Sequence, residues 1–410
     1  MNMKTQNEKL SFWKVGNKPT LLCAFLYFDL SFMVWVVLGP LGVQISKDLG
    51  LTAAQKGLMV ATPLLAGAFL RIVMGFLVDL IKPKATGVMG QVIVIAALLW
   101  AWLGDLGQYQ SLLFLGVLLG FAGASFAVAL PLASRWYPPE HQGTALGIAG
   151  AGNSGTVFAA LFAPSLAVAY GWQSVFGICL IPLSIVLIIF TIFAKNSPTT
   201  PPAKSAFEYI KVLRDQDAWW FMFFYSVTFG GFSGLASSLT IYFNTQYGLS
   251  PVVAGYLTAG CVFAGSLVRP VGGLLSDRIG GIRTLSITYI VAAIALCVAS
   301  LGLDSIAGAV VAFVVAMLAL GTGNGAVFQL VPQRFRKEIG VMTGIVGMAG
   351  GIGGFYLASS LGYSKQLTGS YQMGLTIFAA LGIVALLGLS AVKKRWRTTW
   401  GSSSITSAKI

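Results

Sequence analysis

The chain has 410 residues, of which 56% are hydrophobic and 9% charged, and its mean hydropathy is +0.82. Globular chains carry about 25% charged residues, so this composition excludes a soluble enzyme, a disordered chain and a disulfide-rich secreted domain. Lysine and arginine number 26 against 12 acidic residues, a formal net charge of +14. In a soluble protein this excess of basic residues would suggest nucleic-acid binding. Whether it does so in this chain depends on where the basic residues lie.

Long apolar runs predict twelve membrane-spanning helices, because a bilayer core of about 30 Å needs roughly 20 apolar residues per helix. Strands of a membrane barrel would instead alternate over about 10 residues. The first six spans are expected at 20–44, 57–79, 86–104, 111–133, 143–169 and 174–194. The other six are expected at 218–243, 251–275, 284–303, 306–331, 340–362 and 371–392. The predicted fold class is an all-α integral membrane protein.

The spans form two predicted six-helix bundles, 20–194 and 218–392, joined by the polar, proline-containing linker 195–217. Residues 1–19 and 393–410 are polar ends. The first segment lacks a short apolar core followed by a small-residue cleavage site, so we expect no removable signal peptide.

Basic residues are concentrated on one side of the predicted bundle. An even number of spans places both chain ends and the linker on the same side of the membrane. This side also carries 21 of the 26 lysines and arginines. Only Lys47, Lys56 and Lys365 fall on the other side. The positive-inside rule makes the basic side cytoplasmic. We therefore expect a multi-pass protein of the cytoplasmic membrane, in contact with the lipid bilayer and not with nucleic acid.

The two remaining basic residues, Arg71 and Arg269, lie in apolar spans at matching positions of an internal repeat. The segment AGAFLRIVMGFLVD aligns without a gap with AGSLVRPVGGLLSD, at an offset of 198 residues. The glycine-rich strings GIAGAGNSG (147–155) and GIVGMAGGIGG (344–354) align at an offset of 197. Two parallel six-helix halves are an architecture of secondary transporters.

An arginine at mid-bilayer costs about 3 kcal/mol or more, so Arg71 and Arg269 need an explanation. One interpretation is structural, with guanidinium groups bonded to helix carbonyls or reaching the membrane interface. We favour an anion site, because repeat-related residues face each other across a pseudo-two-fold axis. A guanidinium stays protonated, and its planar fork suits a planar oxyanion.

The glycine-rich strings, the matched arginines and the loop sequences 75–79 and 273–280 resemble the major facilitator superfamily, and within it the nitrate/nitrite porter family. The resemblance covers essentially the whole chain, and FLYFDLSFMVWVVLGP is similar to the nitrate-uptake branch. The first loop copy departs from the family pattern, with Leu80 where an arginine is usual. The resemblance implies a secondary transporter of nitrate, with nitrite as a further substrate, that works by alternating access and is not an enzyme.

The same resemblance implies a substrate site. Arg71 and Arg269 would clamp nitrate in its plane. Phe126 and Phe229 match phenylalanines that sandwich the faces of the anion, and Tyr225 matches a tyrosine that donates to it. Such a site would discriminate by shape against tetrahedral phosphate and sulfate.

The glycine-rich strings supply the other implied substrate residues. Asn153 would donate its amide to the anion, and the alternative is a helix–helix hydrogen bond worth under about 1 kcal/mol. Gly150, Gly152, Gly347 and Gly351 are expected mainly to permit close helix packing. Their bare backbone would also let a small ligand approach.

Apart from Asp79, which ends the second span, Asp29 is the only acidic residue within a predicted span. It is either permanently salt-bridged or protonated, or it carries protons, as intramembrane carboxylates commonly do; we lean to the proton carrier. Asp79, Asp277 and Arg278 lie at cytoplasmic helix ends, where the family signature implies gating salt bridges.

Nitrate entry into a negative-inside cell costs about 2.3 kcal/mol per charge per 100 mV, so uptake requires coupling. We expect nitrate import with protons; nitrate/nitrite antiport is the alternative, and an anion channel or nitrate sensor would be a different class. No metal or cofactor is expected, since the single histidine, His141, lies in a polar loop. We expect a monomer.

Overall fold

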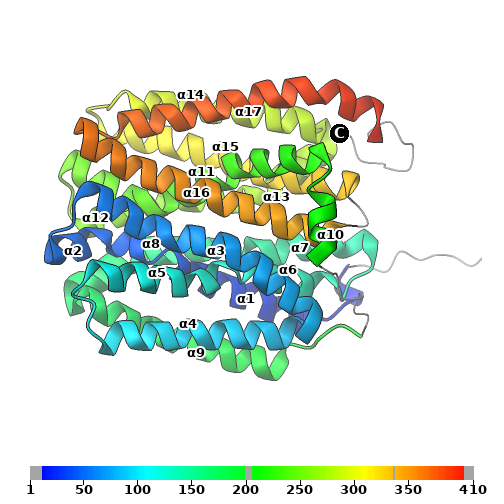
Figure 1. Ribbon diagram of the computed structural model, residues 1–410, viewed down its shortest axis with the longest axis horizontal. Helices are drawn as coiled ribbons and strands as arrows, with labels where there is room; N and C mark the ends of the chain where they lie inside the picture. Colours follow the sequence, from blue (N-terminus) through cyan, green and yellow to red (C-terminus); the bar gives the residue numbers. More distant parts are fainter. Residues whose placement is uncertain (1–11, 199–205, 336–337, 401–410) are drawn as a thin grey trace, which may run out of the picture.

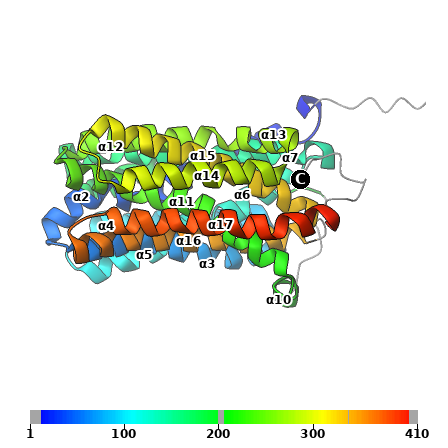
Figure 2. The ribbon, with the colours of Figure 1, turned by 90° about the horizontal axis from the view of Figure 1, so that it is seen from above.

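The computed structural model describes residues 12–198, 206–335 and 338–400, and the regular structure in these ranges is helical. The long helices run side by side along one common direction (Figures 1 and 2). Within the described ranges, eleven helical segments are long and apolar enough to cross a membrane. The twelfth span is α11 (Gln216–Tyr247), 32 residues long, whose many Ser, Thr and Gly residues are mostly buried. The predicted all-α membrane fold is confirmed.

The first half begins with the short η1 (Phe12–Lys14) and contains α1 (Lys18–Trp35), α2 (Leu38–Leu49), α3 (Ala53–Ile81), α4 (Pro83–Leu103), α5 (Tyr109–Gly123), α6 (Phe126–Ser134), α7 (Pro139–Gly150), η2 (Ala151–Ser154), α8 (Gly155–Tyr170) and α9 (Trp172–Phe193). After α10 (Ala206–Val212), the second half contains α11, α12 (Pro251–Leu267), α13 (Arg269–Ile279), α14 (Gly281–Ser300), α15 (Ile306–Arg334), α16 (Ile339–Thr368) and α17 (Gln372–Thr398). The linker therefore holds a helix, and α17 extends six residues beyond the predicted end of the last span.

Four spans are interrupted, which apolar length alone does not predict. The breaks fall at 36–37 between α1 and α2, at 124–125 between α5 and α6, at η2 between α7 and α8, and at Val268 between α12 and α13. At the first break Pro40 lacks the N–H that would bond the Val36 carbonyl, and the Gly39 N–H donates to this carbonyl at 2.9 Å. Discontinuous helices commonly form the substrate sites of transporters.

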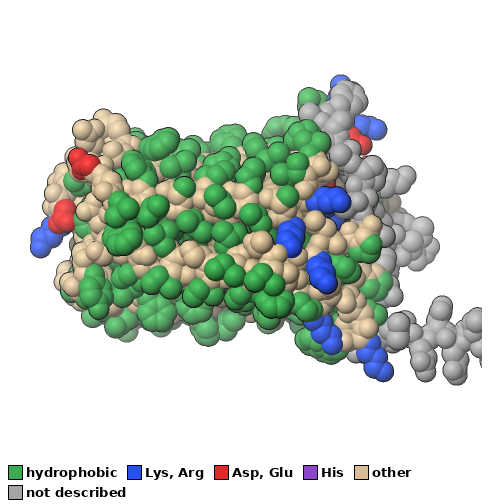
Figure 3. Space-filling view, turned by 90° about the horizontal axis from the view of Figure 1, so that it is seen from below, with side chains coloured by type: hydrophobic (Ala, Val, Ile, Leu, Met, Phe, Trp, Pro, Cys, Tyr) green, Lys and Arg blue, Asp and Glu red, His purple; other side chains and the backbone are tan. Residues whose placement is uncertain are grey.

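The face of the bundle seen in Figure 3 is largely apolar along its middle, and most of the Lys and Arg side chains on this face gather toward one end. We call this the basic end; α3 ends there and α11 begins there. Asp217, at the start of α11, accepts hydrogen bonds from Arg334 at 2.9 Å, from Trp396 at 2.7 Å and from Arg395. This network joins the basic ends of α11, α15 and α17.

The two halves pack across their interface through α3 with α16 and through α8 with α12. A methyl group on Gly57 would lie 2.7 Å from Gly362 Cα, and one on Gly255 would lie 2.6 Å from the Ala160 carbonyl oxygen. These contacts lie away from the basic end. Toward the basic end, α7 and α13 pack on helices of their own half, so the halves are closed at the end opposite to the basic end.

Candidate functional site

Arg71 lies in α3 with only 1% of its surface exposed. Its Nε donates to the Gly123 carbonyl at 3.1 Å, and its Nη1 donates to the Gly347 carbonyl at 2.5 Å. Gly123 ends α5 in the first half, whereas Gly347 lies on α16 in the second. The Nη2 group is buried without a hydrogen-bond partner among the described residues. Arg71 therefore joins the two halves and keeps one donor for a ligand.

The interruption between α5 and α6 explains why the Gly123 carbonyl can accept from Arg71. In a continuous α-helix the Ala127 N–H would bond this carbonyl. Here the Ala127 N–H donates to Ala124 at 2.9 Å instead. The broken helix therefore supplies the backbone acceptor that orients the arginine.

Arg269 is the first residue of α13, directly after the interruption at Val268, and is 9% exposed. Its Nη2 donates to the Tyr225 hydroxyl at 3.3 Å. Its Nη1 is buried without a partner in the described part of the chain. The second arginine thus also retains a free donor.

Both arginines lie next to the ring of Phe126. Its ring centroid lies 5.2 Å from the guanidinium carbon of Arg71 and 5.9 Å from that of Arg269. In the described ranges no acidic side chain forms an ion pair with either guanidinium. Among the described residues, two buried positive charges from opposite halves are therefore compensated by carbonyls, a hydroxyl and aromatic faces.

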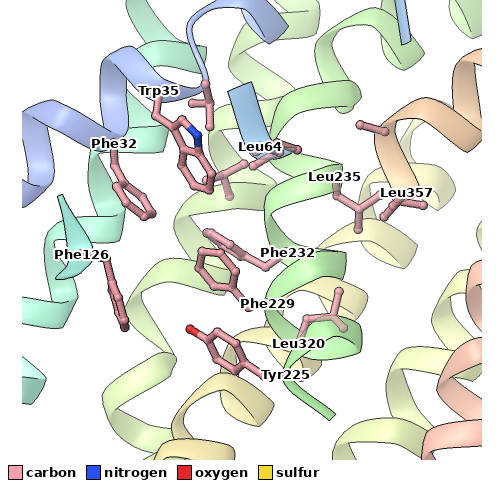
Figure 4. Close-up of a cluster of buried hydrophobic side chains, with 14 of the residues drawn as sticks. Phe32, Trp35, Leu64, Phe126, Tyr225, Phe229, Phe232, Leu235, Leu320 and Leu357 are labelled. Atoms are coloured by element: carbon pink, nitrogen blue, oxygen red, sulfur yellow. The ribbon is translucent and has the colours of Figure 1, made fainter. Parts of the chain in front are cut away.

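Aromatic rings form the walls of the site (Figure 4). Tyr225 and Phe229 are stacked with centroids 5.1 Å apart and an interplanar angle of 8°. Phe229 lies 5.1 Å from the guanidinium carbon of Arg71, and Trp35 lies 5.3 Å from it. Phe328 packs its ring against Tyr225 at 4.9 Å and lies 5.8 Å from Arg269. Trp35 and Phe328 were not among the residues expected from the sequence, because aromatic residues are too frequent in this chain to single them out.

The predicted glycines occupy different environments. A methyl group on Gly347 would lie 3.5 Å from Arg71 Cδ and from the Phe126 ring, so Gly347 lines the site. A methyl group on Gly351 would lie 2.7 Å from Ala68 Cβ, which makes Gly351 a helix-packing glycine between α16 and α3. Gly152 packs against α1, and beside Gly150 a methyl group would meet nothing within 4 Å.

Asn153 lies in η2 and is fully buried, and both polar atoms of its side chain are without a partner in the described chain. The contacts that the structure gives Arg71 and Arg269 do not include Asn153. Its amide therefore has an unused donor and an unused acceptor at a helix break. Its role in binding the anion stays a prediction.

Asp29 lies on α1 and is 3% exposed. The Ser154 hydroxyl donates to its Oδ1 at 2.6 Å. Asp29 forms no salt bridge with any described residue, so the salt-bridged interpretation is not what the structure shows. The hydrogen bond connects Asp29 to η2, the segment that carries Asn153.

The three residues expected in gating salt bridges differ from one another. Asp79 pairs with Arg135 at 2.9 Å, within the first half. Asp277 instead accepts a hydrogen bond from Gln329 at 3.1 Å. Among described residues, neither Asp277 nor Arg278 forms an ion pair, so the gating salt bridges between helices expected of these two residues stay a prediction. The main packing partners of α13, which carries both residues, are α12, α14 and α15 of its own half.

Comparison with known protein families identifies the family of this chain. Residues 20–358 match the Major Facilitator Superfamily, so the chain belongs to this family and is a secondary transporter rather than an enzyme.

Curated relatives point to one branch of the superfamily. The chain is 32% identical over 375 residues to "Probable nitrate/nitrite transporter NarK2" of Mycobacterium tuberculosis (strain ATCC 25618 / H37Rv), covering 90% of this chain and 95% of the relative. It is 32% identical over 359 residues to "Nitrite extrusion protein" of Bacillus subtilis (strain 168), covering 87% and 88%. The resemblance to the nitrate/nitrite porters is therefore confirmed.

A solved structure supports the fold alone. The bacterial homologue of the human lysosomal transporter Spinster, in an inward-facing and occupied conformation, aligns with a TM-score of 0.69 at 19% identity. The alignment covers 96% of this chain and all of that one.

Proposed function

We propose that this chain carries nitrate, with nitrite as a further substrate, across the cytoplasmic membrane by alternating access. The observation that carries the proposal is the pair Arg71 and Arg269. Both are buried, they come from opposite halves, and they flank one phenylalanine ring. Each has an Nη group without a hydrogen-bond partner among the described residues. A bound monovalent anion would neutralise one of the two charges and accept from both donors.

The chemistry of the site suits a small planar anion. Guanidinium N–H groups donate in one plane, which matches the oxygens of nitrate. The rings of Phe126 and Phe229 can then cover the faces of the anion, and Tyr225 can donate its hydroxyl from the edge. A tetrahedral anion would project an oxygen toward one of these rings, and a buried oxygen against a ring is left without a hydrogen bond.

The direction of opening follows from the packing of the halves. We propose that the basic end faces the cytoplasm, since positively charged loops favour that side. The structure is closed at the opposite end and both site arginines are buried, so it then represents an inward-facing state whose site is shielded from solvent. The hydrogen bond from Arg71 to the Gly347 carbonyl joins the two halves. A rocking movement of the halves would therefore act on this bond and on the bound anion together.

For coupling, we propose that protons accompany nitrate and that Asp29 carries one of them. Asp29 is buried, and its partner Ser154 follows Asn153 directly in η2. A change of charge at Asp29 would therefore act on the segment that holds a candidate substrate ligand. Antiport of nitrate against nitrite is the second candidate, and the absence of an acidic partner for either site arginine within the described residues favours it. Two uncompensated charges disfavour the empty carrier.

The coupling is tested with purified protein in liposomes. Proton-coupled import predicts nitrate accumulation when the pH gradient is imposed in the absence of internal nitrite. Asp29→Asn keeps an acceptor for Ser154, and it should abolish this gradient-driven uptake while exchange continues. Asp304→Asn, an exposed residue, is the matched control. Gradient-independent uptake that needs internal nitrite in the wild type would establish antiport instead, and full gradient-driven uptake by Asp29→Asn would remove Asp29 from the mechanism.

A further inference from the structure

A second cationic feature lies on the outside of the bundle, at the basic end, where α14 and α17 run side by side (Figures 1 and 2). A groove of about 430 Å³ opens between them. Its lining combines the cations Arg283, Lys393 and Arg397 with the apolar side chains Ile279, Ile282 and Ile287. It is separate from the anion site, since it shares no residue with it.

The three cations have no acidic partner in the part of the chain that the structure describes. Within the described residues Arg283, Lys393 and Arg397 form no salt bridge, and no acidic side chain lines the groove. Arg395 of the same helix shows the contrast, because it bonds the buried Asp217. Three like charges around one groove repel each other, so the groove favours an anionic ligand.

The groove continues into an exposed apolar stripe. On α14, Ile287, Ile290 and Ile294 follow Arg283 at spacings of four, three and four residues, which places all four on one face of the helix. These isoleucines are 51%, 44% and 59% exposed. An elongated apolar group could therefore extend from the cations toward the membrane interior.

We infer that this groove binds an anionic phospholipid. Its phosphate would lie among Arg283, Lys393 and Arg397, and an acyl chain would follow the isoleucine stripe. Basic pockets between membrane helices on the cytoplasmic side suit such head groups. A soluble phosphate would use the cations but not the apolar floor. The inference rests on the membrane location of the chain and is independent of which anion it transports.

Native mass spectrometry of the full chain in detergent, with equimolar phosphatidylglycerol and phosphatidylethanolamine, tests the inference. We expect the wild type to retain phosphatidylglycerol selectively. Each basic residue near an anionic lipid contributes about fivefold in affinity, so R283Q/K393Q/R397Q should weaken retention on the order of 100-fold. The control K195Q/K211Q/R214Q removes the same charge from the same end outside the groove and should change it less than about twofold.

Two further experiments distinguish specific lipid binding in the groove from general attraction of anions to the basic end. Ser286→Phe fills the groove without altering charge and should also release the lipid. Inorganic phosphate at millimolar concentration should neither displace the lipid nor raise the melting temperature as phosphatidylglycerol does. Equal retention of both lipids, equal loss in the control variant, unchanged retention in Ser286→Phe or full displacement by phosphate would each overturn the inference.

Discussion

Replacing Arg71 with lysine tests whether the guanidinium fork, rather than charge alone, binds the anion. Arg71 spends Nε on Gly123 and Nη1 on Gly347, and offers Nη2 to a ligand. A lysine ammonium carries its donors on a single atom and cannot reach three separated acceptors. Losing one charge-assisted hydrogen bond costs about 1.5–3 kcal/mol. We therefore expect nitrate to bind roughly 10- to 150-fold more weakly to Arg71→Lys.

Isothermal titration of nitrate into the purified protein measures this change. Arg214→Lys, an exposed substitution at the basic end, should leave the Kd within about twofold of the wild type, as surface changes usually do. Thermal unfolding of Arg71→Lys shows whether the variant keeps its fold, since the Gly347 carbonyl loses its donor. An Arg71→Lys protein that folds and binds nitrate as tightly as the wild type would refute the planar clamp.

Three further substitutions separate binding from packing. Tyr225→Phe removes the hydroxyl that accepts from Arg269 but keeps the stacked ring, so the nitrate Kd should rise roughly 2- to 10-fold in the same titration; an unchanged Kd would remove the hydroxyl from the site. Gly351→Ala places a methyl group 2.7 Å from Ala68 Cβ and should lower stability by about 1–3 kcal/mol through separation of α16 from α3; an unchanged melting temperature would contradict that packing. Asp217→Asn weakens the network of two arginines and a tryptophan, and it should destabilise the protein by about 1–3 kcal/mol in thermal unfolding with nitrate affinity retained, whereas a selective loss of affinity would show that the network acts on the site.

The sequence was sufficient to predict the twelve-span fold, because apolar length and the count of basic residues need no knowledge of packing. The same count left Arg71 and Arg269 as the two unexplained charges, and the repeat related them to each other. The structure then shows both beside Phe126. These features could be predicted because burying a charge in a membrane is costly, so an arginine within an apolar span is rare and stands out in the sequence.

The contacts that orient the arginines could not be predicted in this way. The Gly123 carbonyl becomes available through a local rearrangement at 124–125, which changes neither hydropathy nor length. Trp35 and Phe328 reach the site through helix packing, and nothing in their own sequence neighbourhood distinguishes them from other aromatic residues. The gating salt bridges expected of Asp277 and Arg278 depend on how the halves are positioned, which differs between states of one sequence.

Counterflow of labelled nitrate into liposomes loaded with unlabelled nitrate tests most directly the claim that the two arginines form the transport site for a planar anion. The account predicts rapid label uptake by the wild type, competition by external nitrite but not by sulfate or phosphate, and loss of uptake in both Arg71→Lys and Arg269→Lys. Equal competition by sulfate, or undiminished counterflow in the two lysine variants, would contradict it.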